Sequence, residues 1–176
     1  MMTNWTYKQK PDNAFMASFS NEAKGYLGIS EGTPSTDISK WLLDSFQLTE
    51  ANWPNKYSDY SFITVQASKA LEAWIFKLAN DLGIETTNDK VGVLQDQIVG
   101  QLNLLLEGVE SKLGEIIKQE IAYLKIFIKE YRHEVVHCSH KMESSQQAKN
   151  KVMVLYEKIN SITSKLIKAG LLKESA

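Results

Sequence analysis

The chain has 176 residues, of which 43% are hydrophobic, so it can build one domain with a buried core but hardly two. Its formal net charge of −1 excludes a protein coated in positive charge for nonspecific binding to duplex nucleic acid, and its single cysteine excludes an internal disulfide. Because the chain lacks both a secretory signal and the roughly 18 uninterrupted apolar residues of a membrane-spanning helix, we expect a cytoplasmic protein without membrane contact.

Residues 1–57 are predicted to form an N-terminal arm. They contain all three prolines and show little sustained periodicity, so we expect this arm to be largely irregular. One short helix is predicted within residues 35–46, where capping residues precede apolar side chains at helical spacing. These side chains belong to Ile38, Trp41, Leu42 and Phe46. The aromatic content indicates an arm that packs on the rest of the domain rather than a loose tail.

Residues 58–176 are predicted to form four long helices that pack as a bundle, giving an all-α protein with one structural domain overall. The helices are expected to begin near residues 58, 88, 111 and 144 and to end near residues 83, 109, 137 and 170. The expected core positions are Phe62, Val65, Leu71, Ile75 and Leu78 in the first helix, Val91, Leu94, Ile98, Leu102, Leu105 and Val109 in the second, Ile116, Ile117, Ala122, Leu124, Phe127, Ile128, Tyr131 and Val135 in the third, and Ala148, Val152, Leu155, Ile159, Ile162 and Leu166 in the fourth.

The only arginine, all three histidines and the only cysteine lie within nine residues at the predicted end of the third helix. They are Arg132, His133, His137, Cys138 and His140. A planar guanidinium suits phosphate or carboxylate in a way that lysine does not, so this cluster indicates phosphate chemistry. Arg132 and His137 lie about 140° apart on a regular helix. One ligand therefore reaches both only if the arginine curls back, the helix frays, or two chains pair as a homodimer with a shared cleft.

The spacing of Arg132 and His137 near the end of a long helix resembles the R-x4-6-H motif of HEPN ribonucleases. Glu72 lies on the first long helix, 60 positions before Arg132, within Lys69-Ala-Leu-Glu-Ala-Trp-Ile-Phe76. This layout is similar to the HEPN domain of the RnlA toxin family, and the similarity covers roughly residues 57–170. The resemblance implies a HEPN-like four-helix bundle over residues 58–176, preceded by the arm with its short helix.

The resemblance also implies an endoribonuclease toxin of a toxin–antitoxin or phage-defence system, with RNA and a cognate antitoxin as partners and no cofactor. The ribose 2′-hydroxyl would attack the adjacent phosphorus, leaving a cyclic phosphate and a free 5′-hydroxyl, without a metal ion. His137 would transfer the proton, since imidazole titrates near neutral pH. Arg132 would stabilise the phosphate charge, and Glu72 would orient Arg132 or His137 and favour the imidazolium.

Further RNA contacts are expected from His133, Lys129 and Lys141 beside these residues. The last helix adds Lys149, Lys151, Lys158, Lys165 and Lys168, for which a solvated face is the ordinary interpretation. Single-stranded RNA is the expected substrate because its backbone can bend into the attack geometry and its bases are accessible.

Two other functions compete with RNA cleavage. His133-Glu134-Val-Val-His137 matches the H-E-x-x-H motif, in which both histidines bind zinc and the glutamate is the general base of a metallopeptidase. This motif, however, ends its helix just before a short polar loop, and it leaves Arg132 and Glu72 without a role. The third possibility is a noncatalytic helical module that binds an antitoxin or another partner protein.

Overall fold

Helices form all the regular secondary structure in the part of the chain that the structure describes. The computed structural model describes residues 11–51, 59–86, 91–107, 112–128 and 144–173. Its helices are α1 (Asn13–Ala17), α2 (Asn21–Leu27), α3 (Asp37–Glu50), α4 (Phe62–Asp81), α5 (Val91–Leu106), α6 (Lys112–Ile128) and α8 (Ser145–Lys168). The prediction of an all-α protein is confirmed for these residues. None of these helices combines the length and apolar composition needed to cross a membrane.

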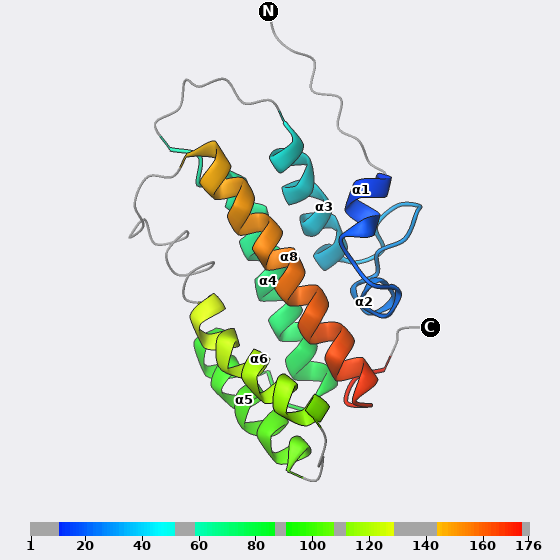
Figure 1. The fold of residues 1–176 in the computed structure, drawn as a ribbon, viewed down its shortest axis with the longest axis vertical. Coiled ribbons are helices and arrows are strands. Elements are labelled where there is room, and N and C mark those ends of the chain that lie inside the picture. The colour runs from blue at the N-terminus through cyan, green and yellow to red at the C-terminus, as the bar shows by residue number, and fades with distance from the viewer. Residues whose placement is uncertain (1–10, 52–58, 87–90, 108–111, 129–143, 174–176) are drawn as a thin grey trace, which may run out of the picture.

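Helices α4 and α8 lie at the centre of the arrangement. Helix α4 packs against α3, α5 and α8, and α8 also packs against α2, α3 and α6. Figure 1 shows α5 and α6 together on one side of this central pair, with α1, α2 and α3 on the other side. One hydrophobic core includes side chains from both groups. Residues before and after position 57 therefore share the same buried interior.

The ends of the helices follow local sequence signals. Helix α3 begins after Thr36, whose hydroxyl accepts a hydrogen bond from the Ser39 backbone N–H at 3.1 Å, as the capping sequence predicted. Helix α4 begins at Phe62, later than expected, because the Asp59 carboxylate accepts hydrogen bonds from the Ser61 N–H and hydroxyl instead. Gly83 and Gly170 adopt φ angles of +74° and +72° just beyond α4 and α8, as expected of glycines that stop a helix.

The arm contains more helix than the sequence indicated. Besides α3, it forms the short helices α1 and α2. They begin directly after Asp12 and Ser20, whose side chains accept capping hydrogen bonds from Phe15 N–H and Ala23 N–H. The expectation of a largely irregular segment with one helix was wrong for residues 11–51. Helices of five and seven residues are too short to show a sustained period, yet they bury Phe15 and Tyr26 in the core.

The expected core positions are correct in α8 and partly wrong in α4, α5 and α6. In α4, the predicted Phe62 and Val65 are 36% and 38% exposed. The predicted positions Val109, Tyr131 and Val135 lie outside the described residues. All six predicted apolar residues of α8 are buried. In α5, however, Leu105 is 40% exposed and Leu106 is buried instead. In α6, Ile121 is buried while the predicted Ala122 is exposed, and Ile116 is only half-buried. Both helices pack through a slightly different face from the one predicted.

Buried polar groups join α8 to its neighbours. The Trp74 indole N–H of α4 donates a hydrogen bond of 3.1 Å to the Thr163 hydroxyl of α8. On the other side of α8, the Tyr156 hydroxyl donates to the Leu42 carbonyl and lies 2.5 Å from the Ser45 hydroxyl of α3. These contacts satisfy groups that burial would otherwise leave without partners. They also fix the rotation of α8 against α3 and α4.

The buried tyrosines predict a loss of stability in alkaline solution. Burial raises the pKa of both Tyr26 and Tyr156 well above the usual range, and the Asp81 carboxylate adds to the effect at Tyr26. Because the folded-state pKa exceeds the unfolded value near 10, stability is intact below about pH 10 and falls above it by about 1.4 kcal/mol per pH unit for each tyrosine. We therefore expect the free energy of unfolding of Tyr156→Phe, measured in urea between about pH 9 and 11, to fall less steeply than that of the wild type. The slopes should differ by about 1.4 kcal/mol per pH unit above about pH 10. Equal slopes would contradict this account.

Candidate functional site

Glu72 lies on the one stripe of α4 that faces outward. Because α4 packs between α3, α5 and α8, ten of its twenty residues are buried. Exposed and half-buried residues follow one another at spacings of three and four along its remaining face: Phe62, Val65, Lys69, Glu72 and Phe76. A rigid central helix therefore presents the Glu72 carboxylate at the surface of the domain. This position suits a residue that must be held in place while it acts on a ligand.

An open pocket surrounds Glu72. It has a volume of about 360 Å³ and is lined by Trp41 of α3 and by Lys69, Glu72, Ala73 and Phe76 of α4. Trp41, Ala73 and Phe76 are half-buried and pack against the hydrophobic core from its outer side. The core thus supports the apolar wall from behind. Lys69 and Glu72 add one positive and one negative group to this wall.

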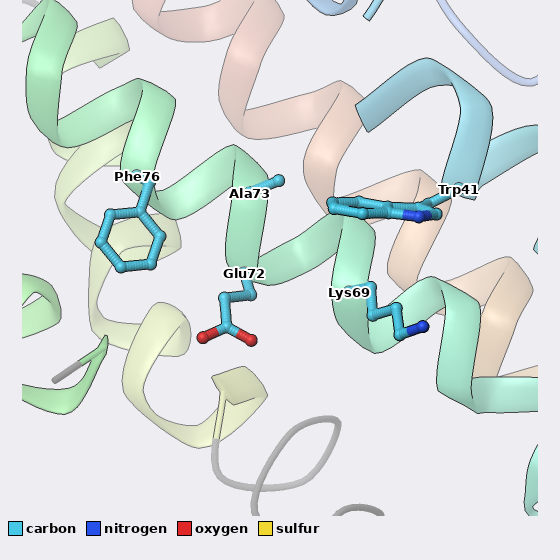
Figure 2. Close-up of a pocket in the computed structure, with 5 residues that line it drawn as sticks. All are labelled: Trp41, Lys69, Glu72, Ala73 and Phe76. Atoms are coloured by element: carbon cyan, nitrogen blue, oxygen red, sulfur yellow. The ribbon is translucent and has the colours of Figure 1, made fainter. Parts of the chain in front are cut away.

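The directions of these side chains divide the pocket into an apolar and a charged part. Figure 2 shows the Trp41 indole reaching from α3 to α4, where it lies beside the small side chain of Ala73. The carboxylate of Glu72 extends away from α4, between Phe76 and Lys69, in the direction of the end of α6. Arg132 follows Ile128, the last residue of α6, by four positions in the sequence.

The other predicted site residues fall outside the described part of the chain. They are Arg132 and His137 for catalysis, His133, Lys129 and Lys141 for substrate binding, and His133 with His137 for the alternative zinc site. The meeting of Glu72 with Arg132 or His137 stays a prediction. Among the described residues, no group of three or more histidine, cysteine, aspartate or glutamate side chains can hold a metal ion. That observation does not bear on the H-E-x-x-H motif, which lies outside them.

Three lysines of α8 make contacts within the protein. Lys165 and Lys158 lie 2.9 Å and 3.6 Å from the Glu120 carboxylate of α6, and the side chains of these two lysines are 26% and 31% exposed. Lys149 donates a hydrogen bond of 3.4 Å to the Ala51 carbonyl. These lysines stabilise the packing of α8. They are weaker candidates for RNA contact than Lys69, which is exposed at the pocket.

Sequence reasoning missed Trp41, Phe76 and Lys69 as site residues. Trp41 was assigned to the apolar face of the arm helix, and Lys69 and Phe76 were given no role. The spacing of Lys69, Glu72, Ala73 and Phe76 places all four on one side of a helix, and this signal is visible in the sequence. The position of Trp41 beside them depends on the packing of α3 against α4, which no local pattern encodes.

Comparisons with known proteins add no family assignment. Neither a family model, nor a curated protein sequence, nor a solved structure matches the chain. The similarity to HEPN ribonucleases rests on the spacing of Glu72, Arg132 and His137 and on the helical fold. The assignment to that family therefore stays a prediction.

Proposed function

We propose that the protein is a metal-independent endoribonuclease of the HEPN type, acting in the cytoplasm as the toxin of a toxin–antitoxin or phage-defence system. The main observation in support of this proposal is the position of Glu72. Its carboxylate lies in an open pocket on the central helix and extends toward the end of α6, which leads in sequence to Arg132 and His137. An all-helical domain with α4, α5, α6 and α8 packed around one core also supports the resemblance to HEPN proteins.

In the proposed reaction the ribose 2′-hydroxyl attacks the adjacent phosphorus, and the bond between that phosphorus and the 5′-oxygen breaks. His137 takes the proton from the 2′-hydroxyl while water protonates the departing 5′-oxygen, or it protonates that oxygen while water accepts the 2′-hydroxyl proton. Arg132 donates two hydrogen bonds to the phosphate oxygens, where negative charge grows in the transition state. The products are a 2′,3′-cyclic phosphate and a free 5′-hydroxyl. No step needs a metal ion or an added cofactor.

The proposal includes a homodimer with a shared cleft. The roughly 140° between Arg132 and His137 on a regular helix makes it difficult for one chain to direct both side chains at one phosphate. Two chains related by a two-fold axis can instead contribute one residue each to every site. A molar mass from light scattering tests this part directly. A strict monomer at the concentration used for cleavage assays would contradict the shared cleft.

RNA cleavage by the purified chain tests the proposed function. We expect cleavage of single-stranded RNA that persists in a chelator and leaves cyclic-phosphate and 5′-hydroxyl ends, identified by mass spectrometry. Metal analysis on the same sample tests the competing function. Bound zinc together with peptide hydrolysis that depends on Glu134 would replace the nuclease by the metallopeptidase. A stable protein complex with neither activity would support the noncatalytic module.

Removing the charge of Glu72 is expected to weaken catalysis without unfolding the protein. Glu72→Gln keeps the size of the side chain, and we expect kcat to fall about tenfold to a hundredfold, within the range of groups that position a catalytic residue. The pH profile of kcat should move to lower pH, because a neighbouring carboxylate stabilises the charged imidazolium. Glu157→Gln, at an exposed site on α8, is the matched control. Equal activity and equal pH profiles in the two variants would remove Glu72 from the site.

A further inference from the structure

The pocket at Glu72 combines two features that a single kind of ligand would use together. Trp41 and Phe76 offer aromatic side chains held against the core, while Lys69 offers an exposed positive charge at the same opening. These residues come from two packed helices, so they are positioned before any ligand arrives. The opening is also close to the carboxylate that the proposed function uses.

We propose that this pocket holds one nucleobase of single-stranded RNA beside the cleaved phosphate, an inference that rests on the proposed function. The base stacks on the Trp41 indole in the space that the small Ala73 side chain leaves open (Figure 2). Lys69 pairs with a phosphate of the same strand. Stacking in this position places the sugar and phosphate of that nucleotide next to Glu72.

Size and charge favour this occupant over others. A volume of about 360 Å³ lies at the lower end of small-molecule sites, which suits one nucleotide and is too small for a helix of a partner protein. An aliphatic ligand would bury apolar surface but offer no negative group to the exposed Lys69 ammonium. A nucleotide satisfies the lysine through its phosphate and the aromatic wall through its base.

The inference gives the arm a role in substrate binding. Trp41 belongs to α3, which precedes residue 57, whereas the other four lining residues belong to α4. Because every base has an aromatic face, stacking on Trp41 strengthens RNA binding without reading the sequence. The pocket therefore increases the affinity for RNA and positions the strand at the cleaved bond. Preference for a particular RNA sequence would come from contacts elsewhere.

Binding of an uncleavable RNA tests the inference separately from catalysis. The probe is a fluorescent single-stranded RNA of about twelve nucleotides whose 2′-hydroxyls are methylated, so that it can bind but cannot be cleaved. We expect Trp41→Leu and Ala73→Leu to raise its Kd about tenfold to a hundredfold, the range of one lost base stack. Trp41→Phe, which keeps an aromatic ring, should lose much less. Ala122→Leu adds the same bulk at an exposed position of α6 and is the matched control.

The outcomes separate the pocket from the proposed function. If wild type cleaves RNA while Trp41→Leu and Ala73→Leu bind the probe like wild type, the pocket inference is wrong and the nuclease stands. If wild type binds the probe through Trp41 but cleaves no RNA, the pocket binds a nucleobase as inferred, while the nuclease and the cleaved phosphate beside the pocket are wrong. If Trp41→Leu does not fold, as judged by circular dichroism, Ala73→Leu alone decides. Failure of wild type to bind the probe overturns the inference.

Discussion

Replacing His137 with alanine is expected to lower the rate of RNA cleavage about a hundredfold to ten-thousandfold, the usual contribution of a general acid or base. The alanine side chain can neither accept the proton of the 2′-hydroxyl nor return one to the leaving oxygen. Binding of the methylated RNA should change little, because the loss belongs to the transition state. Single-turnover cleavage rates, measured beside the Kd of the probe, separate the two effects. An active His137→Ala protein would exclude the proposed mechanism.

Arg132 offers a sharper comparison, because it can be replaced without losing its charge. Arg132→Lys keeps the positive charge but not the planar pair of donors, so cleavage should stay far below wild type. If Arg132→Lys restored most of the rate lost in Arg132→Ala, the role of Arg132 would be reduced to simple charge. Glu157→Gln, at an exposed position of α8 away from the proposed site, serves as the control.

Mixing two inactive variants tests whether the cleft is shared between chains. Suppose that each cleft takes Arg132 from one chain and His137 from its partner. In a dimer of Arg132→Ala with His137→Ala, one cleft then lacks both residues and the other has both. Random pairing makes half of the dimers mixed, so about a quarter of wild-type activity should return. If both residues come from the same chain, every cleft in the mixture lacks one of them. No activity would then return.

The buried face of a helix was predictable where the spacing of its apolar residues defines a single face. In α8 the predicted apolar residues recur at spacings of three and four over most of its 24 residues, so they define one face despite the apolar run at residues 152–156, and all six are buried. In α5 the run Leu104-Leu105-Leu106 does not indicate which of the three leucines is buried. Leu106 is buried because of the way α5 packs against α4 and α6. In α6 the adjacent residues Ile121 and Ala122 pose the same problem. Tertiary packing decided these positions.

The candidate site was predictable only for the part that lies on one helix. Glu72 was predicted from its distance to Arg132, and its half-buried position at the pocket on α4 is consistent with that role. Trp41 lies 31 positions before Glu72 in the sequence and reaches the same pocket only through the packing of α3 on α4. Such a pairing depends on which faces of two helices meet, and a single sequence does not encode it locally.

Trp74→Ala is expected to have the largest effect on stability. Trp74 is fully buried in the central helix α4, and its indole N–H donates to Thr163 of α8. Truncation leaves a large cavity, which costs about 3 to 5 kcal/mol of the free energy of unfolding. Domains of this kind are stable by only about 5 to 15 kcal/mol, so the variant should be barely folded. Urea unfolding followed by circular dichroism measures the change without relying on tryptophan fluorescence.

Further variants show how much of this loss comes from the burial of Trp74 and how much from its hydrogen bond. Trp41→Ala makes the same chemical change at a half-buried position and should cost clearly less. Thr163→Val leaves the buried indole N–H without its acceptor, at about 1 to 3 kcal/mol. Adding Trp74→Phe removes that stranded donor, so the double variant should lose less stability than the sum of the two single variants. If Trp74→Ala cost no more than Trp41→Ala, Trp74 would not hold the contact between α4 and α8 on which the position of Glu72 depends.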